Sequence, residues 1–262
     1  MKKLIASDFD GTITAKGKRE ENVKAIAEWR REGNLFGVVT GRNHKSILHD
    51  IRELSVECDF LICSNGAVAW AFADDGEKRL FLRNYTASLL PSLMGYSREC
   101  GMREFGISTL MNDIFVRREL LERAHAAGRL DFSGDVLPVG IPWKVRRLKR
   151  VVQFTAAFES VEKSMDAAQK MRRRFDGMIE AYPSGEVLDC VASGVSKADG
   201  VSRVAEYFGI PHSCCFTVGD GHNDVSMLDA YSSFAVESAL DEVKRHAKRT
   251  VSSVAEMIEM LW

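Results

Sequence analysis

The stretch "LIASDFDGTIT", residues 4–14, places an apolar run directly before two aspartates, Asp8 and Asp10. A short apolar run of this kind predicts a fully buried strand. Two carboxylates ~4 Å apart repel each other by roughly 4 kcal/mol at an effective dielectric of about 20. The aspartate pair therefore needs neutralising partners from elsewhere in the chain.

Strand and helix patterns alternate on both sides of the chain's middle. After the first strand, amphipathic helix patterns and apolar strand patterns follow in turn at 20–33, 35–40, 44–54 and 60–66. The same alternation returns near the C-terminus, where Ser196 is the expected N-cap of a helix that Gly209 ends. This order of elements predicts an α/β fold with a parallel sheet and right-handed crossovers.

The middle of the chain has a different pattern. Two long helical patterns, near 86–100 and 159–175, are mixed with strand-like runs and longer polar connections, as in an α+β domain. The simplest architecture is a Rossmann-like parallel-sheet core, residues 1–83 and 184–262, interrupted by an inserted α+β domain, residues 84–183.

Composition limits the partners that we expect. The 262 residues carry a formal net charge of -1, which gives no global attraction to nucleic acid or to an acidic membrane surface. The N-terminal apolar run is too short for a signal peptide, and no apolar stretch is long enough to span a membrane. We therefore expect a cytoplasmic protein. The basic stretch "KVRRLKR", residues 144–150, is interpreted as a solvated or substrate-facing loop, with nucleic acid or polyphosphate binding as the alternative.

Several polar residues follow the predicted core strands or open the helices after them. In an open parallel sheet the ligand crevice lies outside the carboxyl ends of the strands, so these side chains should converge. They are Asp8, Asp10, Thr40, Lys197, Asp220 and Asp224.

This set of side chains indicates a metal and a phosphoryl group. Several carboxylates together need a cation, and hard oxygen ligands without His or Cys favour Mg²⁺. A metal held by carboxylates, beside a lysine and backbone N–H groups, suits a phosphoryl group.

Four motifs occur in a fixed order: "DFDGT" at 8–12, "VVTGR" at 38–42, "SK" at 196–197 and "GDGHND" at 219–224. In these motifs the chain resembles the haloacid dehalogenase-like hydrolase superfamily, in its Cof-type branch. The interval between the first two motifs is too short for an inserted domain. The resemblance therefore implies a cap domain between the second and third motifs, and "SNGAV" at 64–68 is also similar to that branch.

The resemblance implies roles for the catalytic and phosphate-binding residues. Asp8 would attack phosphorus and form an aspartyl-phosphate, while Asp10 would protonate the leaving oxygen and later activate water. Thr40 and Lys197 would hold the phosphoryl oxygens with the N–H of Gly41. Asn223 would contact the phosphoryl group or orient the site.

The resemblance also implies a metal site. Mg²⁺ would be bound by the side chains of Asp8 and Asp220 and by the carbonyl of Asp10. Asp224 would be a further ligand or would orient one of the others.

The function expected from these residues is Mg²⁺-dependent hydrolysis of a small phosphorylated metabolite, such as a sugar phosphate or a similar phosphomonoester, through an aspartyl-phosphate. Two alternatives stay open. One is a phosphomutase or phosphotransferase that uses the same intermediate, and the other is a non-catalytic regulator that binds a phosphometabolite. The sequence names neither the substrate nor the oligomeric state.

Overall fold

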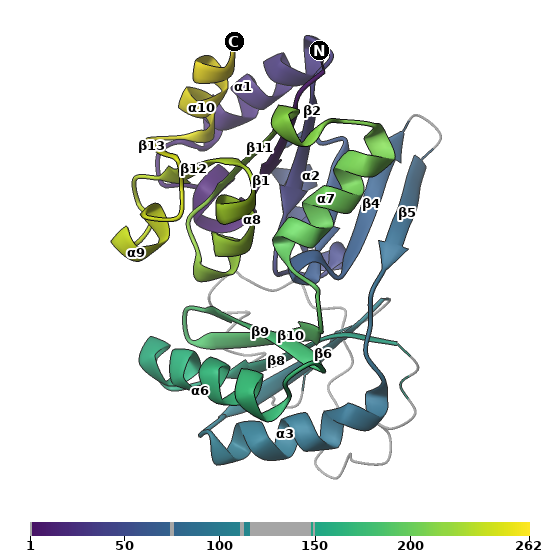
Figure 1. Ribbon diagram of the computed structural model, residues 1–262. Helices are drawn as coiled ribbons and strands as arrows, with labels where there is room; N and C mark the ends of the chain where they lie inside the picture. The colour runs from purple at the N-terminus through teal and green to yellow at the C-terminus, as the bar shows by residue number, and fades with distance from the viewer. Residues whose placement is uncertain (1, 74–75, 111–112, 116–147, 149) are drawn as a thin grey trace. The chain divides into compact units, whose positions relative to one another are not determined.

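The computed structural model describes residues 2–73, 76–110, 113–115, 148 and 150–262, which form two compact units (Figure 1). The first unit comprises Met1–Gly41, Ile47–Leu82 and Ser196–Trp262, and the second comprises Arg42–Ser46 and Arg83–Val195.

The first unit is built on one eight-stranded sheet. Its strand order is β13-β12-β11-β1-β2-β3-β4-β5, so β1 lies between β2 and β11 and pairs in parallel with both. The expected parallel sheet is extended at one edge by two antiparallel pairings, of β3 with β4 and of β4 with β5. The strands are β1 (Leu4–Ser7), β2 (Leu35–Val39), β3 (Phe60–Cys63), β4 (Val68–Ala73), β5 (Gly76–Leu82), β11 (Cys215–Gly219), β12 (Ser232–Val236) and β13 (Arg249–Val251).

Helices enclose the central strands of this sheet. Every residue of β1, β2 and β3 is buried, so both faces of these strands are covered, as their continuous apolar runs predict. Helices α7 and α8 pack against each other and contribute to one apolar cluster with the strands, while α1 contacts α10 and β2. The helices are α1 (Arg19–Arg31), α2 (His44–Glu53), α7 (Lys197–Phe208), α8 (Val225–Ala230), α9 (Asp241–Lys244) and α10 (Val254–Leu261).

Helix α7 begins and ends where the sequence predicts. The hydroxyl of Ser196 accepts a hydrogen bond from the N–H of Asp199 at 3.0 Å, which is the geometry of an N-cap. Gly209 follows the helix in the left-handed conformation, with φ of 66°. Lys197 is therefore fixed as the first residue of α7.

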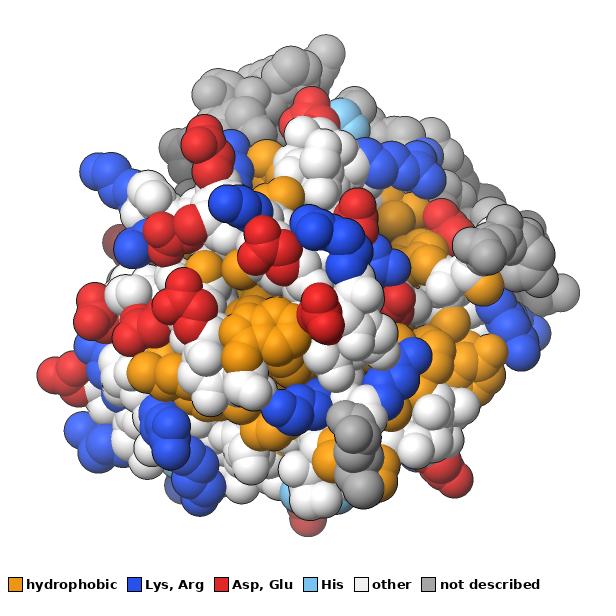
Figure 2. Space-filling model, turned by 90° about the horizontal axis from the view of Figure 1, so that it is seen from above, with side chains coloured by type: hydrophobic (Ala, Val, Ile, Leu, Met, Phe, Trp, Pro, Cys, Tyr) orange, Lys and Arg blue, Asp and Glu red, His pale blue; other side chains and the backbone are white. Residues whose placement is uncertain are grey.

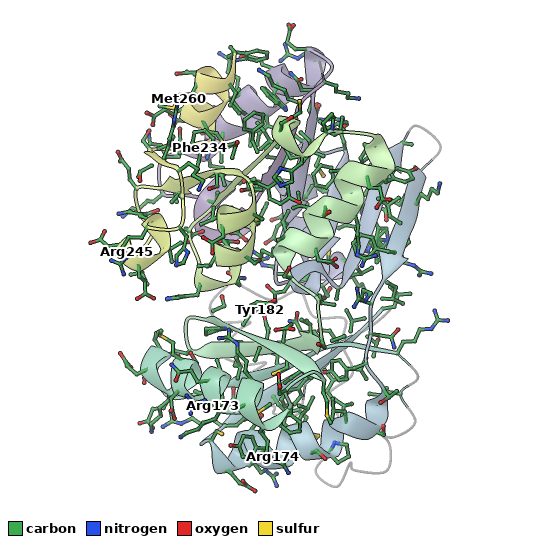
Figure 3. The ribbon with its side chains drawn as sticks, in the orientation of Figure 1. Arg173, Arg174, Tyr182, Phe234, Arg245 and Met260 are labelled. Carbon is green, nitrogen blue, oxygen red and sulfur yellow. The ribbon has the colours of Figure 1, made fainter. Side chains whose placement is uncertain are left out.

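Over its described residues, the second unit is an antiparallel sheet with two helices. Its strand order is β7-β6-β8-β10-β9, and α3 and α6 pack on β8, β9 and β10. The unit ends at Val195, beyond the expected limit at residue 183, because β10 pairs with β8 and β9. The hydroxyl of Tyr182, which is labelled in Figure 3, donates to the carbonyl of Val195, the last residue of the unit, at 2.7 Å. The elements are α3 (Leu90–Glu99), β6 (Glu104–Thr109), β7 (Asp113–Phe115), β8 (Val151–Ala157), α6 (Val161–Arg174), β9 (Ile179–Ser184) and β10 (Val187–Ala192).

The surface in Figure 2 carries acidic and basic side chains interspersed with apolar ones. In the part of the chain that the structure describes, no helix is both long enough and apolar enough to cross a membrane. Most of the basic stretch 144–150, namely residues 144–147 and 149, lies outside the described residues.

Candidate active site

The candidate site lies at the carboxyl ends of four neighbouring strands of the first unit. Asp8 follows β1, Thr40 follows β2, the turn Ser64–Gly66 follows β3, and Asp220 follows β11. These strands are adjacent in the order β11-β1-β2-β3. The convergence predicted from the sheet topology is therefore present for these residues.

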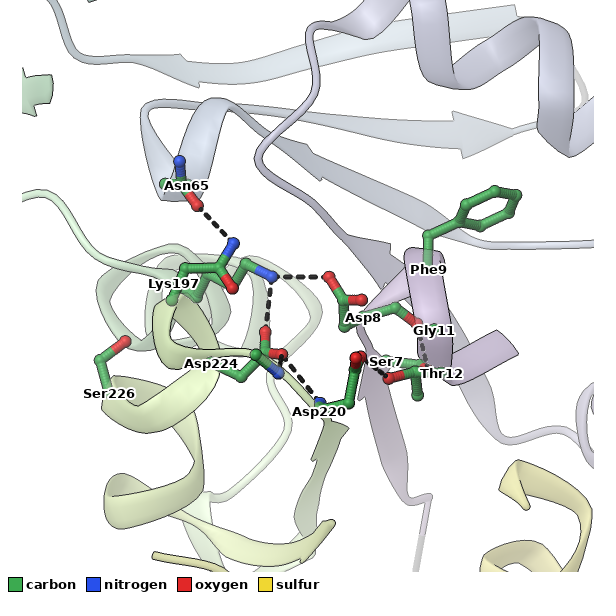
Figure 4. A network of polar contacts seen from close by, with 12 residues as sticks. Ser7, Asp8, Phe9, Gly11, Thr12, Asn65, Lys197, Asp220, Asp224 and Ser226 are labelled. Carbon is green, nitrogen blue, oxygen red and sulfur yellow. Dashed lines mark hydrogen bonds and ion pairs between the residues drawn. The ribbon is translucent and has the colours of Figure 1, made fainter. Parts of the chain in front are cut away.

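Lys197 lies at the centre of a buried charge cluster (Figure 4). Its Nζ donates to Oδ1 of Asp8 at 2.7 Å and to Oδ1 of Asp224 at 2.5 Å. The exposed fractions of the three side chains are 0% for Lys197, 9% for Asp8 and 1% for Asp224. Such pairs are poorly screened by solvent, so each charge depends on its partners.

Three carboxylates gather around this lysine. Asp8, Asp220 and Asp224 each offer an oxygen, and these oxygens lie within 4.8 Å of one another. When all three are ionised, the single positive charge of Lys197 leaves two negative charges uncompensated. An all-oxygen donor set with this charge fits a divalent hard cation such as Mg²⁺.

Both oxygens of Asp224 are engaged within the protein. Oδ1 accepts from Lys197, and Oδ2 accepts from the backbone N–H groups of Asp220 at 3.0 Å and Gly221 at 2.8 Å. The carboxylate also lies so close to Gly219 that a Cβ there would be 2.5 Å from it. Asp224 therefore fixes the loop that carries Asp220 and the ammonium group of Lys197 at the same time.

Asp220 is held by the loop that follows Asp8. The hydroxyl of Thr12 donates to Oδ1 of Asp220 at 2.6 Å. Gly11 has a φ of 83°, and a Cβ on it would lie 2.4 Å from Oδ2 of Asp220. Only glycine accommodates both the backbone conformation and the close approach of this carboxylate. The sequence analysis did not predict this role of Thr12. The only indication of it is that Thr12 belongs to the motif "DFDGT".

The loop that carries Asp8 and Asp10 is anchored to the helices behind it. Asn22, on α1, is fully buried, and its Nδ2 donates to the carbonyl of Ile13 at 3.0 Å. Its Oδ1 accepts from the backbone N–H of Ala255 at 2.9 Å. One side chain thus joins the loop, α1 and the first turn of α10.

The other predicted site residues lie around this cluster. Asp10 is exposed, with φ of -75° and ψ of 119°, and its charge raises the pKa of Asp220. Thr40 is buried, and its N–H donates to the carbonyl of Ile62 at 2.9 Å. Gly41 is the next residue along the chain. Asn223 donates its Nδ2 to Oδ1 of Asn65 at 3.1 Å, a contact that the sequence analysis did not anticipate.

Burial dominates the electrostatics of the cluster. Desolvation raises the pKa of Asp8 well above its ordinary value, and the charge of Lys197 opposes this shift. Desolvation alone would lower the pKa of Lys197, but the carboxylates of Asp224 and Asp8 raise it, so the lysine stays protonated. Desolvation also raises the pKa of Asp220 to about 6, with the Thr12 hydrogen bond acting in the opposite direction.

The pKa of Asp220 makes stability depend on pH in the metal-free protein. Its ordinary value is 3.8, so between about pH 4 and 6 the folded state holds a proton that the unfolded chain has lost. The free energy of unfolding should therefore decrease as the pH rises through this range, and Asp8 contributes in the same direction. Urea denaturation in chelator at several pH values measures the slope. Asp220→Asn should reduce it, and an unchanged slope in that variant would contradict the assignment.

Known proteins resemble this chain over nearly its whole length. A family model described as haloacid dehalogenase-like hydrolase matches residues 5–257. The chain is 34% identical over 257 residues to 5-amino-6-(5-phospho-D-ribitylamino)uracil phosphatase YitU of Bacillus subtilis (strain 168), with 95% of this chain and 92% of that protein covered. It is 24% identical over 268 residues to 5-amino-6-(5-phospho-D-ribitylamino)uracil phosphatase YbjI of Escherichia coli (strain K12), with 96% and 91% covered.

Solved structures share the fold. A HAD subclass IIB sugar phosphatase matches with a TM-score of 0.81 at 18% identity, over 99% of this chain and 98% of that one. A haloacid dehalogenase-like hydrolase from B. subtilis matches with a TM-score of 0.80 at 20% identity, over 99% and 100%. These likenesses confirm the predicted α/β fold class. The family model and the whole-length relatives confirm the predicted superfamily and the predicted class of enzyme, a phosphatase: the chain belongs to the haloacid dehalogenase-like hydrolase family.

Proposed function

We propose that this protein is a Mg²⁺-dependent phosphatase that hydrolyses small phosphomonoesters through an aspartyl-phosphate on Asp8. The observation that carries the proposal is the buried cluster in which Lys197 bridges Asp8 and Asp224 while Asp220 lies beside them. Two uncompensated negative charges, a lysine and a nucleophilic carboxylate at one sheet edge match the needs of phosphoryl transfer.

Asp8 is proposed as the nucleophile. Lys197 holds Oδ1, whereas Oδ2 makes no hydrogen bond with any other described residue and is available for attack. Attack on phosphorus forms the bond between Asp8 and the phosphoryl group and breaks the ester P–O bond. The ammonium group of Lys197, kept protonated by its two carboxylate partners, then offers positive charge to the phosphoryl oxygens.

Asp10 is proposed to move the protons. Its carboxyl group is exposed, so it can reach a leaving oxygen that Asp8 cannot protonate while attacking. It gives a proton to that oxygen, then takes one from the water that attacks phosphorus and breaks the bond to Asp8. The products are the alcohol and inorganic phosphate, and Asp8 is regenerated.

Mg²⁺ is proposed to be held by Asp8, Asp220 and the carbonyl of Asp10, where it would neutralise charge on the phosphoryl oxygens. Asp224 is proposed to orient the site, because both of its oxygens already accept hydrogen bonds from Lys197 and from backbone N–H groups. The unit Arg83–Val195 is proposed to serve as the cap that selects the rest of the substrate.

Phosphorylated sugars and sugar alcohols are the substrate class that we propose to test first. The names of YitU and YbjI give a substrate with a phosphate ester on a ribityl chain, and a structural neighbour is named a sugar phosphatase. These substrates share a phosphate ester on a carbon skeleton with several hydroxyl groups, and a carboxylate–lysine–metal site acts on the phosphate group itself.

Steady-state hydrolysis of p-nitrophenyl phosphate and of a panel of sugar phosphates tests the proposed function. We expect turnover with Mg²⁺ and none after chelation, with inorganic phosphate as the product. Transfer of the phosphoryl group to a sugar hydroxyl would instead indicate a phosphotransferase. Ligand binding without turnover across the panel would indicate a regulator and would contradict the proposal.

A further inference from the structure

The turn Ser64–Gly66, which follows β3, has an unusual backbone. Its three residues all have positive φ, at 50°, 54° and 102°. In the described part of the chain, only three non-glycine residues have a positive φ, and Ser64 and Asn65 are two of them. A positive φ is uncommon for non-glycine residues, although less so for asparagine, and such residues are enriched at functional sites.

The backbone of Asn65 ties the turn to the end of β2. Its N–H donates to the carbonyl of Thr40 at 3.0 Å, and the N–H of Thr40 donates to Ile62 at 2.9 Å. Thr40 is therefore held between β3 and the turn that follows it. A change in the turn would move the hydroxyl that is proposed to bind phosphate.

The side chain of Asn65 ties the turn to the loop after β11. Oδ1 of Asn65 accepts from Nδ2 of Asn223 at 3.1 Å. Asn65 is fully buried and Asn223 is 9% exposed, so water cannot readily replace this hydrogen bond. The amide of Asn223 is thus fixed by a residue 158 positions earlier in the chain.

Gly66 brings the same turn against the start of α7. A Cβ on Gly66 would lie 2.0 Å from the carbonyl oxygen of Ser196, the N-cap residue of that helix. Gly200, one turn into α7, also lies close to the turn: a Cβ on it would lie 3.2 Å from Cα of Gly66. The first helical turn of α7, which carries Lys197, therefore contacts the segment Ser64–Gly66 directly.

We propose that Asn65 is a positioning residue for the phosphate-binding side of the site. It holds Thr40 through its backbone and Asn223 through its side chain, and its left-handed conformation sets Gly66 against the N-cap of Lys197's helix. Asn65 would act through these neighbours and take no direct part in the chemical step. The inference rests on the proposed function, because the neighbours matter only if they bind a phosphoryl group.

Asn65→Gly tests the contribution of the side chain of Asn65 separately from that of its backbone conformation. Glycine adopts a positive φ without strain, so the turn should persist, but the loss of a buried hydrogen-bond acceptor for Asn223 should lower the melting temperature. The hydrogen bond to Asn223 is lost, and we expect kcat/KM with Mg²⁺ to fall about 10- to 100-fold, as for other residues that orient a site. The dissociation constant of inorganic phosphate, measured by calorimetry with Mg²⁺, should rise by a similar factor.

Ser55→Gly is the matched control, because Ser55 has the same φ of 54° and lies between α2 and β3, before the strand whose other end carries the turn. It should leave kcat/KM and phosphate binding unchanged. In a double-mutant cycle, Asn65→Gly combined with Asn223→Ala should lose no more activity than Asn223→Ala alone. Additive losses, or an Asn65→Gly variant with wild-type kinetics, would overturn the inference.

The two proposals fail in different ways. If the wild-type protein turns over phosphomonoesters and Asn65→Gly is unaffected, the role of Asn65 is wrong and the proposed function stands. If the wild-type protein binds phosphate without turnover, the calorimetric comparison still tests Asn65. A wild-type protein that neither turns over phosphomonoesters nor binds phosphate overturns both.

Discussion

Asp8→Asn is expected to reduce turnover by about 10⁴-fold or more, the range seen when a catalytic nucleophile is removed. The amide keeps the size of the side chain but cannot form the aspartyl-phosphate. The stability of the variant, in contrast, should not decrease. Burial disfavours the ionised form of Asp8, so removing its charge should leave the melting temperature of the metal-free protein equal or higher. Lys197 retains Asp224 as an ion-pair partner in this variant.

Asp59→Asn is the control, and it should have the opposite pattern of effects. Asp59 precedes β3, where its carboxylate accepts from Arg30 at 2.9 Å and from the N–H of Phe36 at 2.9 Å. This substitution should lower the melting temperature and leave kcat unchanged. Steady-state kinetics and thermal denaturation of both variants check the contrast, and mass spectrometry of wild-type protein quenched during turnover checks for a phosphoryl group on Asp8. Residual turnover near the wild-type rate in Asp8→Asn would show that another group attacks phosphorus.

Lys197→Met is expected to lower the free energy of unfolding of the metal-free protein by about 3–5 kcal/mol, the cost of removing one partner from a buried ion pair. The variant leaves Asp8, Asp220 and Asp224 within 4.8 Å of one another without their cation. Mg²⁺ should restore part of this loss, because a ligand that binds only the folded state stabilises it. Turnover should be lost as well.

Urea denaturation with and without Mg²⁺ measures both effects for Lys197→Met. Lys170→Met is the control, since Lys170 pairs with Asp166 at 2.6 Å on the exposed side of α6. Its removal should leave the denaturation midpoint unchanged. If Lys197→Met is as stable as the wild type in chelator, the three carboxylates do not depend on the lysine charge, and its proposed role in neutralising them is wrong.

The central strands and the charge cluster could be predicted from local patterns. Short apolar runs followed by Asp8, Thr40 and Asp220 mark β1, β2 and β11 because these strands are buried on both faces. The rule that ligands bind at the carboxyl ends of parallel strands then brings their polar ends together.

β5 and β10, which the sequence analysis did not predict, lack this signal. β5 is exposed over its first residues and carries charged side chains, as suits an edge strand. β10 has Asp189 in its middle, which breaks the apolar run even though most of its other residues are buried.

The contacts that complete the site could not be predicted either. Thr12 meets Asp220 across 208 positions, and Asn223 meets Asn65 across 158. Threonine and asparagine have many local roles in turns and caps, so nothing in the sequence nearby distinguishes these two. The contacts of Thr12 with Asp220 and of Asn223 with Asn65 follow only from the tertiary structure.

The position of β1 between β2 and β11 has a consequence for how the protein is made. β2 ends at Val39, but β11 begins only at Cys215, after the whole of the second unit has been synthesised. At the usual pace of translation, on the order of ten seconds or more pass in which β1 can pair on one side only. A nascent chain thus presents an apolar strand edge, next to Asp8, that an aggregation partner or a chaperone can engage. Asp8, the proposed nucleophile, can meet Lys197, Asp220 and Asp224 only after these later residues have been synthesised, so a chain that stops before them lacks the proposed site.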